Sequence, residues 1–102
     1  MTSSIDTYAD EAADLLGALA HPGRVRIIHL LSHTEEASAG ELVAASGLSQ
    51  SATSQHLAKL KIQGLVTMRR EGQMLYYRLV DHKARAVLSL LDALFGDGAY
   101  GL

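Results

Sequence analysis

Hydrophobic residues recur every three or four positions through several stretches of the chain, a spacing that places them on one face of an α-helix. The first stretch ends at His21-Pro22-Gly23, where proline interrupts one helix and is tolerated in the first turn of the next. Ser38 and Ser49 stand where helix caps are preferred, and Gly47 and Gly64 stand where helices end. The pattern predicts five helices, at about 6–20, 22–33, between 38 and 47, 50–63 and 81–95.

Two stretches after the fourth helix, Leu65–Arg70 and Met74–Val80, are rich in Val, Leu, Tyr and Thr and indicate strands. Glu71-Gly72 lies between them, so we expect a hairpin. A short helix, a turn at Gly47-Leu48-Ser49 and a longer helix make a helix-turn-helix, and a hairpin directly after it is a wing. The expected fold is mainly α with a small β-hairpin (α+β), a single winged helix-turn-helix domain over residues 1–102 in the order α-α-α-α-β-β-α.

Composition supports one packed domain, because 48% of the 102 residues are hydrophobic and 20% are charged. The absence of cysteine excludes disulfides, thiolate metal sites and cysteine nucleophiles. No hydrophobic run approaches the ~18 residues of a membrane span, and no basic start precedes an apolar stretch as in an export signal. We therefore expect a soluble cytoplasmic protein that has no membrane partner.

Charge is unevenly distributed along the chain. The formal net charge of −2 argues against a nucleic-acid partner when it is taken as an average. Residues 49–80, however, hold five Lys or Arg residues against Glu71 alone, a local net charge of +4. It is the local field that attracts a polyanion, so this block indicates contact with nucleic acid.

The predicted helix 50–63 has two different faces. Thr53, Leu57 and Leu60 fall on one stripe, which we expect to be buried. The other surface carries hydrogen-bonding side chains and no acid; Gln suits adenine, whereas Ser hydroxyls and helix N-terminal amides suit phosphate. These side chains could instead only solvate an exposed helix, but the order of elements favours recognition. The predicted DNA-binding residues of this recognition helix are Ser49, Gln50, Ser51, Ser54, Gln55 and Lys59.

The wing, residues 65–80, adds further candidates. Arg69 and Arg70 end its first strand, where we expect them to reach the DNA backbone or the minor groove, in which arginine is favoured. The alternative is a charged strand end that discourages edge pairing. Gln73 in the turn is a weaker candidate for a DNA contact. Lys61 and Arg78 fit phosphate contact and plain solvation equally well.

Three histidines need separate interpretation. His56 lies at the edge of the buried stripe, and we expect it to hold the helix-turn-helix together rather than to read bases. His29 and His33 are four residues apart on one helix, a spacing that can place two imidazoles on one ion, with Glu35, Glu36 or His82 as a third ligand. We favour a structural role, in which His29 packs near the core and His33 is exposed. No metal site and no cofactor are assigned.

The segments Leu19–Val25, Gly47–Leu60 with Gly64–Val66, and Arg69–Leu79 resemble the ArsR (ArsR/SmtB) family of winged-helix repressors. The resemblance implies a homodimeric bacterial repressor that releases operator DNA when an inducer binds. In that family the fourth helix is the recognition helix, and the first and last helices, here 6–20 and 81–95, form the dimer interface. Independently, the last helix is apolar over most of its circumference, which favours a partner. A two-fold dimer would read an inverted repeat.

The sequence departs from the sensing patterns of that family. Ser38 and Gly40 stand where metal-sensing members place cysteines on the third helix, and His29 occupies a thiol position of the second helix. At the last-helix metal site, Asp81 matches the first ligand, but Lys83 and Leu94 stand at two of the others. No sensing chemistry is carried over, and the effector, whether small molecule or ion, remains unknown.

Three classes of function compete. The first is a sequence-specific regulator that binds double-stranded DNA, and the alternative is a winged-helix module for protein–protein interaction. An enzyme is excluded on the sequence, because no nucleophile–base pair, phosphate-binding glycine loop or complete metal triad is present.

Overall fold

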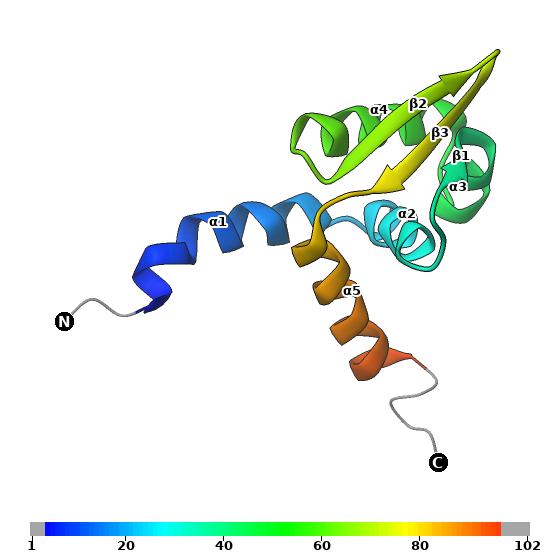
Figure 1. Ribbon diagram of the computed structural model, residues 1–102. Coiled ribbons are helices and arrows are strands. Elements are labelled where there is room, and N and C mark those ends of the chain that lie inside the picture. The colour runs from blue at the N-terminus through cyan, green and yellow to red at the C-terminus, as the bar shows by residue number, and fades with distance from the viewer. Residues whose placement is uncertain (1–3, 97–102) are drawn as a thin grey trace.

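The computed structural model describes residues 4–96. In this part of the chain there are five helices and a small antiparallel sheet whose strand order is β1-β3-β2, with α2, α3 and α4 beside the sheet (Figure 1). The elements are α1 (Ser4–Leu19), α2 (Pro22–Ser32), β1 (Ala37–Ser38), α3 (Ala39–Ser46), α4 (Gln50–Ile62), β2 (Val66–Glu71), β3 (Met74–Leu79) and α5 (His82–Phe95). The predicted winged helix-turn-helix is confirmed, and each helix lies within about two residues of its predicted bounds.

Local signals in the sequence account for the ends of the central helices. Ser38 and Glu41 form a reciprocal capping box at the start of α3, in which each side chain accepts from the other's backbone N–H. Gly47 follows α3 at φ 75° and Gly64 follows α4 at φ 81°. Both angles are left-handed, a region that glycine enters without a Cβ penalty, so these two positions stop the helices and reverse the chain.

Strand β1 was not predicted. It consists of only two residues, Ala37 and Ser38, which pair with Tyr77 and Tyr76 of β3. Two residues are too short a stretch to show alternation. The predicted hairpin is confirmed, but its turn is shifted by one residue: β2 continues through Glu71, which pairs with Met74. The turn is therefore made by the next two residues, of which Gly72 has φ 61°.

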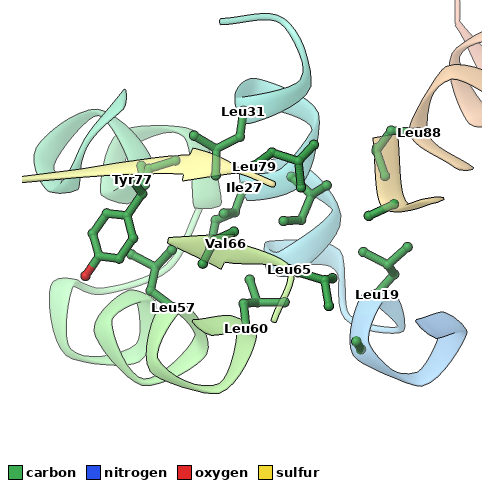
Figure 2. Packing of buried hydrophobic residues seen from close by; sticks show 14 of the residues in the cluster. Leu19, Ile27, Leu31, Leu57, Leu60, Leu65, Val66, Tyr77, Leu79 and Leu88 are labelled. Carbon is green, nitrogen blue, oxygen red and sulfur yellow. The ribbon is translucent and has the colours of Figure 1, made fainter. Parts of the chain in front are cut away.

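The hydrophobic core lies between α2, α4 and the sheet (Figure 2). Helix α2 is central, since Ile27, Ile28 and Leu31 are completely buried. In Figure 2, Leu65 and Val66 at the start of the wing lie between the α2 side chains and Leu57 and Leu60 of α4. Val66 is the first residue of β2, and Leu65 precedes it. The stripe of α4 that the sequence predicts as buried is the one that packs here.

Helices α1 and α5 project away from this core (Figure 1). Each is buried only where it meets α2: Ala18 and Leu19 in α1, and Ala84 and Leu88 in α5. Large apolar side chains elsewhere on them face outward: Tyr8, Leu16, Leu90, Leu94 and Phe95. An open cleft of about 1020 Å³ runs between the two helices. No helix in residues 4–96 is both long enough and apolar enough to cross a bilayer.

A buried hydroxyl pair joins the two helices of the helix-turn-helix. Ser46 and Thr53 are fully buried, and their hydroxyl oxygens lie 2.8 Å apart. The Ser46 hydroxyl also donates to the carbonyl of Val43 (2.9 Å) and accepts from the N–H of Leu48 (3.0 Å). The Ser46 hydroxyl thus forms hydrogen bonds with groups at the end of α3, in the turn and on the inner face of α4.

We expect Ser46→Ala to lower the free energy of unfolding by about 1–3 kcal/mol, because it leaves the buried Thr53 hydroxyl and the Leu48 N–H without their partner. Urea denaturation followed by circular dichroism measures the change. Ser89→Ala, on the exposed surface of α5, is the matched control and should change stability by less than about 0.5 kcal/mol. Equal effects of the two substitutions would contradict this role of Ser46.

Candidate nucleic-acid interface

The outward surface of α4 is made of the residues that the sequence predicts for DNA recognition. All six are exposed: Ser49, Gln50, Ser51, Ser54, Gln55 and Lys59. The Ser49 oxygen caps the helix by accepting from the N–H of Ala52 (3.1 Å), which leaves its own O–H free to donate. The remaining N-terminal amides of α4 point outward with the partial positive charge of the helix dipole, an arrangement that suits a phosphate.

The start of α4 is held against α2 by close packing. Leu48, in the turn before α4, lies over Gly23 in the first turn of α2, so tightly that a Cβ at Gly23 would be 2.5 Å from the Leu48 Cδ1 atom. Leu48 is thus the apolar anchor of the turn, and glycine at position 23 provides the space for it.

Two arginines of α2 position the helix-turn-helix, a role that the sequence analysis missed. The Arg24 Nε donates to the His56 Nδ1 (2.9 Å), and an Arg24 Nη donates to the carbonyl of Ala18 (3.1 Å). Arg26 donates to the carbonyl of Ser46 at the end of α3 (3.2 Å). These guanidiniums lie 20 or more positions from most of their partners along the chain, so no local pattern reveals the contacts. They connect α1, α2, α3 and α4.

His56 has the structural position that the sequence predicts for it. It is partly buried, and its ring centroid lies 4.3 Å from that of His21, the N-cap of α2. Burial, followed by the positive charges of His21, Arg24 and Lys59, holds the pKa of His56 below its ordinary value. The neutral form is also the one whose Nδ1 can accept the hydrogen bond from Arg24.

The two wing arginines differ in their surroundings. The Arg69 guanidinium pairs with Glu36 beside β1 through more than one N–H, donates to Glu71 at 2.8 Å, and lies 4.5 Å from the centroid of the Tyr76 ring. These contacts raise the pKa of Arg69 and lower that of Glu36. Two carboxylates thus neutralise most of its charge, so within the wing Arg69 braces the hairpin against β1.

Arg70, by contrast, is exposed and forms no ion pair within residues 4–96. Lys59 and Lys61 on α4 are likewise unpaired in this part of the chain, and Gln73 is exposed at the tip of the hairpin. Arg78 lies 4.0 Å from Glu35, a long and exposed contact that provides little stability. The available positive charge is therefore carried by Lys59, Lys61 and Arg70.

Comparison with known proteins identifies the family. The family model for the bacterial regulatory proteins of the arsR family matches residues 21–68, from the start of α2 into β2. The HTH-type transcriptional regulator YgaV of Escherichia coli is 38% identical, over 91% of this chain and 94% of YgaV. The transcriptional activator HlyU of Vibrio cholerae is 42% identical, over 83% of this chain and 78% of HlyU. The crystal structure of the transcriptional repressor BigR from Xylella fastidiosa superimposes with a TM-score of 0.86 at 35% identity, covering 93% of this chain and 97% of BigR.

The chain belongs to the ArsR family of bacterial regulatory proteins. It is a DNA-binding transcriptional regulator with a winged helix-turn-helix, and the matches favour this function over the alternative of a protein-interaction module. The family and these relatives are regulators rather than enzymes.

In this ArsR-family regulator the histidines of α2 are not arranged as the sequence analysis favoured. His29 is half exposed rather than packed near the core, and His33 is exposed as expected. Neither Glu35 nor Glu36 joins them, because these acids face Arg78 and Arg69. Their shared neighbour is Asp92 of α5, which is 63 positions from His29 and was not considered as a partner.

The lowered pKa of His56 predicts a pH dependence of stability. Below the ordinary pKa of about 6.5 the unfolded chain binds a proton at His56 more readily than the folded chain does, so the free energy of unfolding falls as the pH falls. Urea denaturation at about pH 7.5 and about pH 5.5 should show a larger loss for the wild type than for His56→Gln. The other histidines are common to both proteins and cancel in the difference. An equal loss of stability in the wild type and in His56→Gln would contradict the lowered pKa of His56.

Proposed function

We propose that this ArsR-family regulator is a homodimeric repressor that binds an inverted-repeat operator in double-stranded DNA in the cytoplasm. Helix α4 enters the major groove, and the hairpin of β2 and β3 lies against the flanking backbone or minor groove. The observation that carries the proposal is the outward surface of α4, on which every exposed side chain from position 49 to 59 is basic, small or hydrogen-bonding and none is acidic. A duplex presents phosphates and base edges to such a surface.

The individual contacts follow from the positions of the side chains. Gln55 and Ser54 lie one turn into α4 on the exposed face, where they reach base edges. Ser49, Gln50 and Ser51 surround the helix N-terminus and bind phosphate oxygens. Lys59 and Arg70 supply unpaired charge to the backbone, and Gln73 adds a contact at the tip of the wing. Arg69 contributes less to binding than Arg70, because its charge is already shared with Glu36 and Glu71.

Dimerisation is supported by the outward apolar faces of the terminal helices. Leu90 and Leu94 are one turn apart on α5, Phe95 is 74% exposed, and Leu16 on α1 is 59% exposed. Exposed apolar side chains clustered on two neighbouring helices indicate a protein interface. A two-fold axis through α1 and α5 would set the two α4 helices about 34 Å apart, the separation of successive major grooves.

Repression of transcription, and release from the operator when an inducer binds, are assigned by analogy with the ArsR family. BigR of X. fastidiosa is described as a repressor, whereas HlyU of V. cholerae is described as an activator. An in vitro transcription assay on a template that carries the selected operator separates the two: repression lowers transcript yield as the protein is added, and activation raises it. We assign no catalytic activity to the chain. The 102 residues contain no cysteine, so they offer an inducer no thiol to react with.

Two substitutions test the DNA interface. Gln55→Ala should weaken binding to a selected operator by about 1–3 kcal/mol and relax its sequence preference. Arg70→Ala should weaken binding to all duplexes alike and lower the slope of log K against log salt by about one per protomer. Fluorescence anisotropy with selected and scrambled duplexes measures both effects.

Gln63→Ala is the matched control, because Gln63 is exposed at the far end of α4 beside the cleft between α1 and α5. It should leave both the operator affinity and the salt slope unchanged. If Gln55→Ala distinguished the selected operator from scrambled duplexes as well as the wild type does, Gln55 would not be a base-reading residue. A wild type with no duplex affinity even at low salt would overturn the proposed function.

The dimer interface has its own test. Leu94→Asp should shift the protein from dimer to monomer in analytical ultracentrifugation, since an unpaired carboxylate is costly to bury in an interface. Met74→Asp is the control: Met74 is 50% exposed, but it lies beside the turn of the hairpin, far from α1 and α5, so the dimer should persist. A monomeric wild type, or equal dissociation of both variants, would refute the interface.

A further inference from the structure

Two histidines and one aspartate converge where the C-terminal end of α2 meets the last turn of α5. The His29 Nε2 lies 3.1 Å from one carboxylate oxygen of Asp92, and the His33 Nε2 lies 3.1 Å from the other. The two imidazole rings are 4.6 Å apart, centroid to centroid, at 61°. One possible ligand atom from each of the three residues lies within 4.8 Å of the other two. All three side chains remain accessible to solvent, so an ion can reach them.

We propose that His29, His33 and Asp92 form a binding site for one divalent transition-metal ion such as Zn²⁺, which joins α2 to α5. Two imidazole nitrogens and one carboxylate oxygen form a ligand set that zinc accepts, and they leave a fourth tetrahedral position for water. Bond lengths of about 2.0–2.2 Å require the ligand atoms to be roughly 3.4 Å apart. The two nitrogen-to-oxygen distances are already close to that value, and side-chain rotation brings the remaining atoms together.

The backbone that carries these ligands is rigid. His29 lies in the last turn of α2 and His33 is the C-cap residue of that helix, whose Ile28 and Leu31 are completely buried. Asp92 lies one turn after Leu88, which is 1% exposed in the same core. The packing of these helices therefore sets the separation of the ligands before an ion arrives, which lowers the cost of ordering them.

Neighbouring charges leave the aspartate available to an ion. Arg85 lines a pocket of about 200 Å³ together with Ser32, His33, Ser89 and Asp92. Its guanidinium, however, donates to the carbonyls of Ser32 (3.0 Å) and Leu79 (3.4 Å) rather than to the carboxylate. Within residues 4–96 the ion pairs of Asp92 are those with the two histidines. A single histidine would satisfy a surface ion pair, so the second imidazole is the feature that favours a metal.

The site is separate from the last-helix pattern to which Asp81 belongs. The Asp81 carboxylate caps α5 by accepting from the N–H groups of Lys83 (2.8 Å) and Ala84 (3.1 Å). Lys83, which follows it, is paired with Glu11 of α1. The Asp81 carboxylate is thus engaged in capping the start of α5, three helical turns away from Asp92.

Titration of the untagged full chain with Zn²⁺ by isothermal calorimetry should give one ion per chain. Co²⁺ should give the visible absorption bands of a four-coordinate ion with nitrogen and oxygen ligands. Asp92→Asn and His33→Asn should each weaken Zn²⁺ binding by at least about tenfold, since each removes one ligand. The melting temperature should rise with Zn²⁺ concentration in the wild type but not in Asp92→Asn.

His82→Asn is the matched control, because His82 is exposed on α5 and lies outside the cluster. It should bind Zn²⁺ as the wild type does. Asp92→Asn keeps the size and exposure of the side chain, and circular dichroism verifies that the variant is folded. The proposal is overturned if the wild type takes up no ion, if the Asp92 and His33 variants bind as tightly as the wild type, or if His82→Asn weakens binding equally.

Discussion

The orientation of α4 depends on a small set of buried polar contacts. The hydroxyls of Ser46 and Thr53 meet where no water can replace either partner, so a rotation of α4 about its axis would leave both unsatisfied. Leu57 and Leu60 supply most of the apolar burial, but hydrophobic contact is not directional and tolerates sliding. The hydroxyl pair selects one rotation of the helix. That rotation turns the glutamines and serines outward.

Charge in this regulator is organised locally rather than by its total. The net charge is −2, yet Lys59 and Lys61 on α4 and Arg70 on the wing are exposed and form no ion pair within residues 4–96. Several other basic residues are used to build the fold: Arg24 and Arg26 bind backbone carbonyls and His56, and Arg69 ties the wing to Glu36. The pairing of Arg69 stiffens the hairpin but removes its charge from the surface that would face DNA. Counting basic residues in a segment therefore overstates the charge that a polyanion meets.

Helix α2 lies between the proposed DNA-binding surface and the proposed metal site. Its first turns hold the helix-turn-helix through Gly23, Arg24 and Arg26, and its last turn carries His29 and His33 toward α5. Its middle is the most buried part of the structure. This buried helix therefore fixes the position of His29 and His33 relative to the helix-turn-helix.

The sequence by itself determined the five helices, the hairpin and the outward face of α4. Helical periodicity, the caps at Ser38 and Ser49, and glycines at left-handed positions are local signals, and they were sufficient to place α3, the turn and α4 with the residues proposed for DNA recognition on the outside. Only the tertiary structure decided which groups meet across the chain. Strand β1 needs Tyr77 beside it, Arg69 finds Glu36, Arg24 finds His56, and Asp92 joins His29 and His33. These partners are 32 to 63 positions apart in the chain, and the two residue pairs between β1 and β3, at 40 and 38 positions, fall in the same range. The chemistry of a side chain determines which kind of group it can bind, but it does not determine where along the chain that group lies. The packing of the core therefore brings each pair together.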